Sequence, residues 1–206
     1  VFPLALWALD RLRRQATAVR WVTAVLLTAA VILSHNLMAL LFFGLLLAWA
    51  VWQVITVGWR AANGRFLFGA LFLGLGLSAF FWLPVILERN AVNLTTLIGA
   101  GDNYDYRTHF LSLTEFFTPT RRLDWGATEP VFHFNLGLAQ WLLGGFGLLM
   151  LALRRVRYAA HAAFFALALA VLLFLMLPVS NFVWQAVPFL PYFQFPWRLL
   201  GAAVAM

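Results

Sequence analysis

The densest group of side chains able to do chemistry lies in the stretch GDNYDYRTH, residues 101–109. Asp102, Asp105 and His109 bring two carboxylates and an imidazole close together in the chain. Such groups hold a divalent metal beside a diphosphate, or act as a general base on a hydroxyl. The spacing does not match an EF-hand loop, which needs a central glycine and a terminal glutamate. A metal-binding role and a solvated loop without chemistry therefore both stay open.

A second polar group follows in TRRLDWG, residues 120–126. Arg121 and Arg122 match the oxygen geometry of a phosphate, and the ring of Trp125 offers a flat face to a sugar. The alternative is an exposed turn held by salt bridges. Both groups belong to the polar segment 88–135, which is long for a simple connection and too rich in aromatic residues for disorder.

Four further polar residues interrupt or border long apolar runs. His35 and Asn36 interrupt VILSHNLMALLFF, and they either contact a substrate of headgroup size or form a tight turn at the membrane surface. Arg198, in FPWRLL, lies at an expected helix start, where a cation opposes the helix dipole. We therefore expect an anion nearby: Glu88, a lipid phosphate or a substrate diphosphate. The alternatives are an Arg198 that reaches up to the lipid headgroups and a Glu88 that is paired or solvated.

The absence of certain motifs excludes several classes of site. The chain has no P-loop, GxSxG elbow, HExxH motif or Rossmann glycine pattern, so no nucleotide cofactor is expected. It has no cysteine, which excludes disulfides and thiolate metal sites. The net charge is +7, but the arginines occur in short clusters between apolar runs. That distribution argues against a nucleic-acid partner.

The composition indicates which elements must carry these groups. Hydrophobic residues make up 64% of the 206 residues and charged residues only 10%, whereas soluble domains are about 45–50% apolar and about 25% charged. No charge occurs between Arg20 and Arg60. One helix over that tract would be about 60 Å long, twice the hydrocarbon thickness of a bilayer. The tract must therefore cross twice and turn at Ser34–Asn36.

We predict an all-α fold, a polytopic bundle of transmembrane helices. Truncated spans are expected at Val1–Leu9 and Trp197–Met206, so residues 1–206 should form a single transmembrane domain, an internal fragment of a longer chain. In HFLSLTEFF, Ser112 and Glu115 fit a capping box, which predicts a short helix at the membrane interface. About five full spans are expected, near residues 17–34, 37–58, 66–87, 136–153 and 159–177.

The arginines predict the orientation of these spans. Alternate crossings place two sets of loops on opposite faces: 10–16, 59–65 and 154–158, against 34–36, 88–135 and 178–196. With their boundary residues, the first set holds nine arginines and the second holds five. By the positive-inside rule the first set is cytoplasmic, so loops 88–135 and 178–196 are extracytoplasmic.

The order of five motifs resembles one bacterial family. The motifs are SHNLMAL, SAFFWLPVILE, YDYRTHFLSLTEFF followed by DWG, FNLGLAQW and PYFQFPWRLL. In this order they resemble the multispanning proteins labelled "6-pyruvoyl-tetrahydropterin synthase-related" membrane proteins, and the resemblance extends over most of the chain. No pterin site is expected, because the four histidines lack the three-histidine zinc spacing of a pterin synthase.

The resemblance implies the architecture of GT-C glycosyltransferases, which take sugars from polyprenyl-phosphate donors on the outer face of the membrane. In that class the catalytic aspartate lies in the first outer loop, which would precede Val1, so the catalytic residue is unknown. Arg198, Arg121 and Arg122 would neutralise the leaving phosphate. The outer cavity would be lined by His35, Asn36, Glu88 and His109.

The resemblance also sets the expected location and partners. We expect an integral protein of the bacterial cytoplasmic membrane whose partners are membrane lipid and a polyprenyl-phosphate-linked sugar. Two alternatives stay open: a flippase or transporter for lipid or polysaccharide, and a non-catalytic membrane scaffold.

Overall fold

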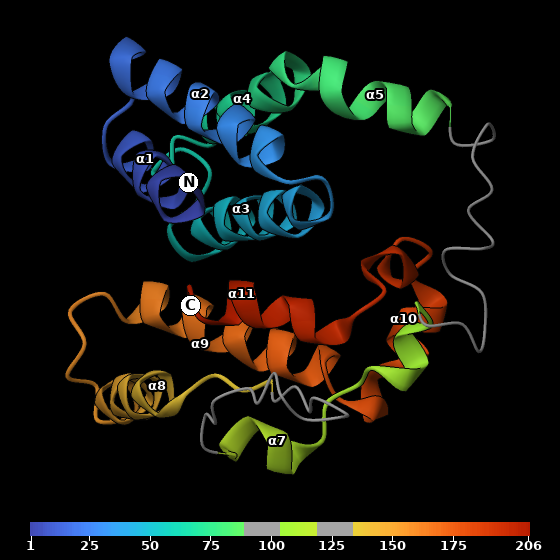
Figure 1. The fold of residues 1–206 in the computed structure, drawn as a ribbon. Helices are drawn as coiled ribbons and strands as arrows, with labels where there is room; N and C mark the ends of the chain where they lie inside the picture. Colours follow the sequence, from blue (N-terminus) through green and yellow to red (C-terminus); the bar gives the residue numbers. More distant parts are fainter. Residues whose placement is uncertain (89–103, 119–133) are drawn as a thin grey trace. The chain divides into compact units, whose positions relative to one another are not determined.

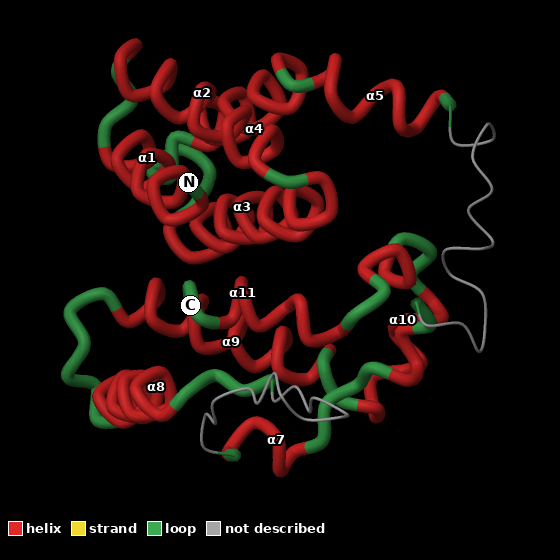
Figure 2. Tube along the Cα trace, viewed as in Figure 1, coloured by secondary structure: helices red, strands yellow, loops and turns green. Residues whose placement is uncertain are grey.

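A computed structural model describes residues 1–88, 104–118 and 134–206 of the chain (Figure 1). Throughout these ranges every regular element is a helix (Figure 2). The predicted all-α class is therefore confirmed. The chain divides into two compact units, Val1–Asn93 and Leu94–Met206, with the boundary inside the predicted 88–135 loop. The prediction of a single transmembrane domain stays a prediction.

Residues 1–88 of the first unit form five helices that follow the apolar runs of the sequence. Its centre is α2, which packs against α1, α3 and α4. Thr17 caps α2, since its hydroxyl accepts from the amide of Arg20. The helices are α1 Phe2–Arg14, α2 Ala18–Ser34, α3 Asn36–Val57, α4 Gly64–Leu77 and α5 Ala79–Leu87.

The contact between α2 and α4 is close because a glycine lies at the crossing. A Cβ atom added to Gly74 would lie 2.7 Å from the Cβ of Thr28 and 2.9 Å from the carbonyl oxygen of Val25. Thr28 is completely buried there. Small residues that let two backbones approach in this way are typical of helix packing in membranes.

The predicted span 66–87 is broken into α4 and α5, which meet at an angle of 67°. The break lies at Ser78, and Pro84 lies inside α5. The Ser78 hydroxyl donates to the carbonyl oxygens of Gly74 and Leu75, and the Trp82 indole donates to that of Leu75. Side chains therefore occupy carbonyls that the next helical turn would otherwise bond, which lets the helix bend at this point.

The second unit combines two apolar helices with many short helical turns. The predicted short helix is present as α7, Leu113–Phe117, with the capping box formed between Ser112 and Glu115. Its longer helices are α8 Leu138–Ala152 and α9 Ala159–Leu175. Proline lies in the first turn of three of the four 3₁₀ helices found in residues 104–118 and 134–206. The short elements are η2 Tyr106–Thr108, η3 Pro178–Ser180, α10 Asn181–Ala186, η4 Leu190–Phe193, η5 Pro196–Leu199 and α11 Leu200–Ala203.

By length and composition, one described helix can cross a membrane unaided, over Leu37–Val57 in α3. Two bent pairs also pass as broken spans: α4 with α5, and α9 with the segment Pro178–Ala186, at 90°. At 17 and 15 residues, α2 and α8 are shorter than the roughly 20 residues that a span needs. The described residues thus support one to three crossings, and the predicted five are not confirmed.

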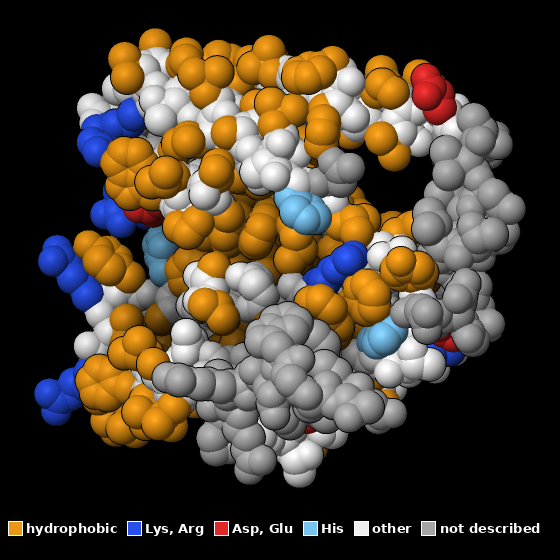
Figure 3. Space-filling view, in the orientation of Figure 1, with side chains coloured by type: hydrophobic (Ala, Val, Ile, Leu, Met, Phe, Trp, Pro, Cys, Tyr) orange, Lys and Arg blue, Asp and Glu red, His pale blue; other side chains and the backbone are white. Residues whose placement is uncertain are grey.

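Large hydrophobic side chains cover much of the surface that Figure 3 shows. Ile55 and Phe80, for example, are each 73% exposed. Isolated exposed apolar residues are ordinary in soluble proteins, but contiguous apolar surface marks a site of contact with lipid or protein. The apolar surface therefore agrees with the composition in pointing to a membrane environment.

Candidate functional site

The segment 104–111, which includes the described part of the densest polar group of the sequence, is held in place by Asp105. The buried Asp105 carboxylate accepts from the backbone N–H of Arg107 at 3.0 Å and from its guanidinium at 3.3 Å. The Thr108 hydroxyl donates to the Asp105 carbonyl oxygen at 2.9 Å. Asp105 therefore begins η2 as an N-cap. Its carboxylate is engaged in shaping this turn.

Tyr106 anchors the same segment to α10. Its ring stacks on the ring of Trp184, with the centroids 5.0 Å apart, and its hydroxyl bonds to Asn181 at 3.3 Å. Phe110 meets Trp184 edge to face. Trp184 is itself completely buried and donates to the carbonyl oxygen of Leu175. Residues 104–111 are thus attached to the end of α9 and to α10, far away in the sequence.

This attachment brings two predicted site residues to one aromatic ring, that of Phe195. The His109 ring lies 4.7 Å from the Phe195 centroid, at an interplanar angle of 66°. The guanidinium carbon of Arg198 also lies 4.7 Å from that centroid. The two groups are therefore within about 9.4 Å of each other. Tyr104 meets the edge of Phe195, and Trp197 stacks on it. We call these five residues, Tyr104, His109, Phe195, Trp197 and Arg198, the Phe195 cluster.

The position of Arg198 is set by an unusual turn. The N–H of Phe195 donates to the carbonyl oxygen of Phe193 at 2.6 Å, closing a γ-turn at Gln194 with φ 61° and ψ −40°. A γ-turn with positive φ is rare and strained for a residue other than glycine. Arg198 donates to the same Phe193 oxygen at 3.1 Å and to Oε1 of Gln194 at 3.4 Å. The strained turn thus supplies both acceptors of the guanidinium.

The Arg198 guanidinium still has N–H donors that can bind an anion. Its acceptors and its ring neighbour are uncharged, and within the described ranges no carboxylate lies within ion-pair distance of it. The side chain is half-buried, so an anion there would interact through less water than at an exposed site. A guanidinium that already uses one edge still offers further donors. The arrangement can bind a phosphate or a carboxylate.

The remaining described candidates lie in the first unit. His35 ends α2 and caps α3, with Nδ1 accepting from the amide of Met38 at 3.4 Å. Asn36 begins α3, and its side chain lies outside the described part of the structure. The predicted turn at 34–36 is therefore present. Glu88 is exposed at the end of α5. Its predicted pairing with Arg198 would join the two units and stays a prediction.

Several predicted residues lie outside the described residues, namely Asp102, Arg121, Arg122 and Trp125. Within residues 1–88, 104–118 and 134–206, no group of three His, Asp or Glu side chains could hold a metal ion. The proposed metal role of Asp102, Asp105 and His109 includes a residue outside these ranges and stays a hypothesis.

Phe195 and Gln194 are the functional candidates that sequence reasoning missed. The signal that could have found them is the segment PYFQFPWR, where two prolines and four aromatic residues surround one glutamine and one arginine. No family model, no curated protein and no solved structure matches this chain.

Proposed function

We propose that this chain is a membrane-embedded part of a GT-C-like glycosyltransferase, in which the Phe195 cluster binds the phosphate of a polyprenyl-phosphate sugar donor. The observation that carries the proposal is Arg198: a half-buried cation, oriented by the turn at Gln194 and without an acidic partner in the described ranges. A lipid-linked phosphate needs a fixed cation beside apolar surface, and the aromatic neighbours of Arg198 provide that surface.

The proposed location follows from the arginines. The chain would lie in the bacterial cytoplasmic membrane, with α3 and the two bent pairs among its crossings and the segments 88–135 and 178–196 outside the cell. The support is that arginines from two loops of the predicted cytoplasmic set lie at one end of the first unit. There the Asn63 side chain donates to the carbonyl oxygen of Arg13 at 2.8 Å.

In the proposed reaction an acceptor hydroxyl attacks the anomeric carbon of the donor sugar. The bond from that carbon to the phosphate oxygen breaks, and polyprenyl phosphate leaves with the electron pair. Arg198 stabilises the charge that develops on the leaving phosphate. A base that is not assigned to any residue of this chain takes the proton of the acceptor. His109, on the same ring as Arg198, is placed to bind the acceptor or the sugar.

The experiment compares Arg198→Ala and Arg198→Lys in the full protein, reconstituted in nanodiscs. Because a hydrogen bond to a charged group contributes about 1.5–3 kcal/mol, Arg198→Ala should weaken the binding of a polyprenyl monophosphate at least about tenfold. Sugar transfer in membranes should fall with it. Arg198→Lys should bind with intermediate affinity, since it keeps the charge but loses the two-pronged geometry.

Arg155→Ala is the matched control, because Arg155 is an exposed arginine of the same unit in the connection between α8 and α9. It should bind like the wild type. If Arg198→Ala bound polyprenyl monophosphate as tightly as the wild type, the donor phosphate would not bind at this cluster. Tight binding without sugar transfer by the wild type would favour the flippase alternative.

A further inference from the structure

The first unit has a second phosphate-compatible site, at the end where the connection between α1 and α2 meets that between α3 and α4. We call this the basic end and define it as Arg11, Arg13, Arg14, Arg20, Arg60 and Arg65. The last turn of α1 is joined to the connection between α3 and α4 by the hydrogen bond from Asn63 to the backbone of Arg13. Arg20 donates to the carbonyl oxygens of Arg11 and Gln15. Figure 3 shows blue side chains beside the connection between α1 and α2.

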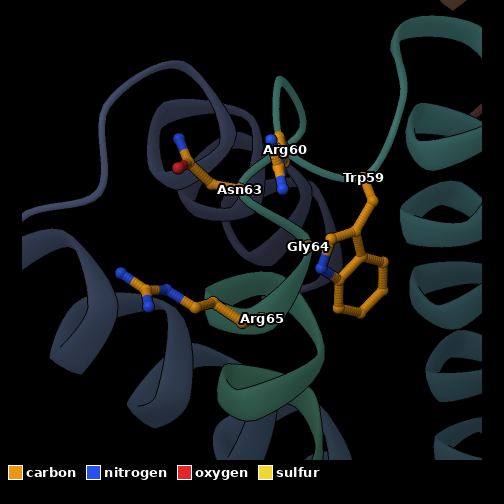
Figure 4. Close-up of a pocket in the computed structure, with 5 residues that line it drawn as sticks. All are labelled: Trp59, Arg60, Asn63, Gly64 and Arg65. Carbon is orange, nitrogen blue, oxygen red and sulfur yellow. The ribbon is translucent and has the colours of Figure 1, made fainter.

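A hollow of about 330 Å³ lies at this end, lined by Trp59, Arg60, Asn63, Gly64 and Arg65 (Figure 4). In that view Trp59 and Arg65 extend to opposite sides of Gly64. The Trp59 ring lies so close to Gly64 that a Cβ atom there would be 2.6 Å from it. Trp59 also stacks on Phe68, with centroids 5.5 Å apart. One wall of the hollow is therefore an aromatic surface held by packing.

The charge of the hollow is not neutralised within the described residues. Asp10 is the only acid in residues 1–87, and its carboxylate bonds to Arg13 at 3.2 Å and to Arg14 at 2.7 Å. Arg60 and Arg65 have no acidic partner in the described ranges. Gly64 begins α4, and no described side chain caps this helix start. Its partial positive charge therefore adds to that of the two arginines.

The position of the hollow along the chain indicates what kind of anion reaches it. The clearest membrane-length segment ends at Val57, two residues before Trp59. A tryptophan directly after a span is typical of the membrane–water interface. Arginine clusters in the same place attract anionic lipids, and basic pockets between spans bind their headgroups. A free phosphate would need the arginines alone, whereas the aromatic wall formed by Trp59, which Phe68 supports by stacking, suits a lipid.

We propose that the hollow binds the phosphodiester of an anionic phospholipid. Arg60 and Arg65 contact the phosphate oxygens, and Trp59 packs beside the glycerol part of the lipid. The proposal needs the basic end to lie at the bilayer surface, and it does not depend on sugar transfer by the Phe195 cluster.

The test measures lipid affinity of the purified full protein by native mass spectrometry. The probes are phosphatidylglycerol, phosphatidylcholine with the same acyl chains, and inorganic phosphate. The double variant Arg60→Gln/Arg65→Gln should bind phosphatidylglycerol about tenfold more weakly than the wild type, because each interfacial arginine contributes appreciably to anionic-lipid binding. Arg60→Lys/Arg65→Lys should stay within a few-fold of the wild type.

The matched control is Arg154→Gln/Arg155→Gln, which removes the same charge from exposed arginines of the second unit. Its affinity for phosphatidylglycerol should equal that of the wild type, and circular dichroism should show the same helix content in all variants. Equal loss in both double variants would overturn the site, as would equal binding of phosphatidylcholine. Displacement of the lipid by an equal concentration of inorganic phosphate would overturn the lipid as its occupant.

Discussion

The arginine side chains of the two proposed sites differ in how firmly their neighbours hold them. In the Phe195 cluster, the Arg198 guanidinium is held by the Phe193 carbonyl, by Gln194 and by the Phe195 ring. In the hollow of the first unit, Arg60 and Arg65 are exposed. A held cation loses little conformational freedom on binding and can select a ligand position, whereas exposed cations attract negative charge over a wider area. The difference suggests one site for a defined donor and one for a class of lipid.

The two units also differ in what makes them rigid. The first unit packs helix on helix through small residues, with Gly74 against Thr28. The second unit holds its short turns with stacked aromatic rings, such as Tyr106 on Trp184 and Phe134 on Trp197. Substitutions at a helix crossing should therefore loosen the packing of helices, and substitutions at a ring should loosen the turns that hold the binding groups in place.

The largest expected effect is on the packing of the first unit. Gly74→Ala should destabilise it by about 1–3 kcal/mol, the usual cost of overpacking, because the new methyl group would overlap Thr28. Gly76→Ala is the control in the same helix, since a Cβ there meets no atom within 4 Å. It should be neutral or slightly stabilising. Denaturant unfolding of the two variants in detergent checks this, and equal stabilities would contradict the close helix crossing.

The second-largest expected effect is on ligand binding. It distinguishes the proposed phosphate site of the Phe195 cluster from the one proposed at the basic end. Phe195→Ala should weaken polyprenyl monophosphate binding about tenfold, because Arg198 and His109 both lose the ring that holds them. Phosphatidylglycerol binding by the first unit should not change. Phe189→Ala, which removes an exposed ring of the same unit, is the control. If Phe195→Ala weakened the binding of polyprenyl monophosphate and of phosphatidylglycerol equally, the two sites would not be independent.

The smallest effect concerns α7. Ser112→Ala removes one half of the capping box and should cost about 1 kcal/mol of local stability. Ser112→Thr should restore the cap. Hydrogen exchange of the Glu115 amide, which donates to the Ser112 hydroxyl, measures this directly. Equal exchange rates in wild type and Ser112→Ala would mean that the cap does not hold the helix.

Local signals in the sequence predicted much of the fold. The first and last residues of α2, α3 and α9 lie within about two positions of the predicted ones. The turn at His35 and the capping box at Ser112 were also predicted correctly. These features depend on neighbouring residues, on apolar run length and on caps, all of which can be read along the chain.

Features that depend on distant contacts could not be predicted in this way. The bend at Ser78 arises from hydrogen bonds of its side chain to helix carbonyls, which no local sequence signal indicates. The meeting of His109 and Arg198 at Phe195 needs the attachment of Tyr106 to Asn181, 75 positions away. The positive φ of Gln194 is set by its turn, because glutamine itself does not favour it. The number of membrane crossings also stays a prediction.

We propose that the Phe195 cluster faces the outside of the cell and that the basic end faces the cytoplasm. The chain has no cysteine, so single cysteines can be introduced at the exposed positions Thr114 and Ala61. With a membrane-impermeant maleimide on intact cells, Thr114→Cys should be labelled and Ala61→Cys should be labelled only after permeabilisation. Labelling of Ala61→Cys in intact cells, with Thr114→Cys protected, would contradict this orientation.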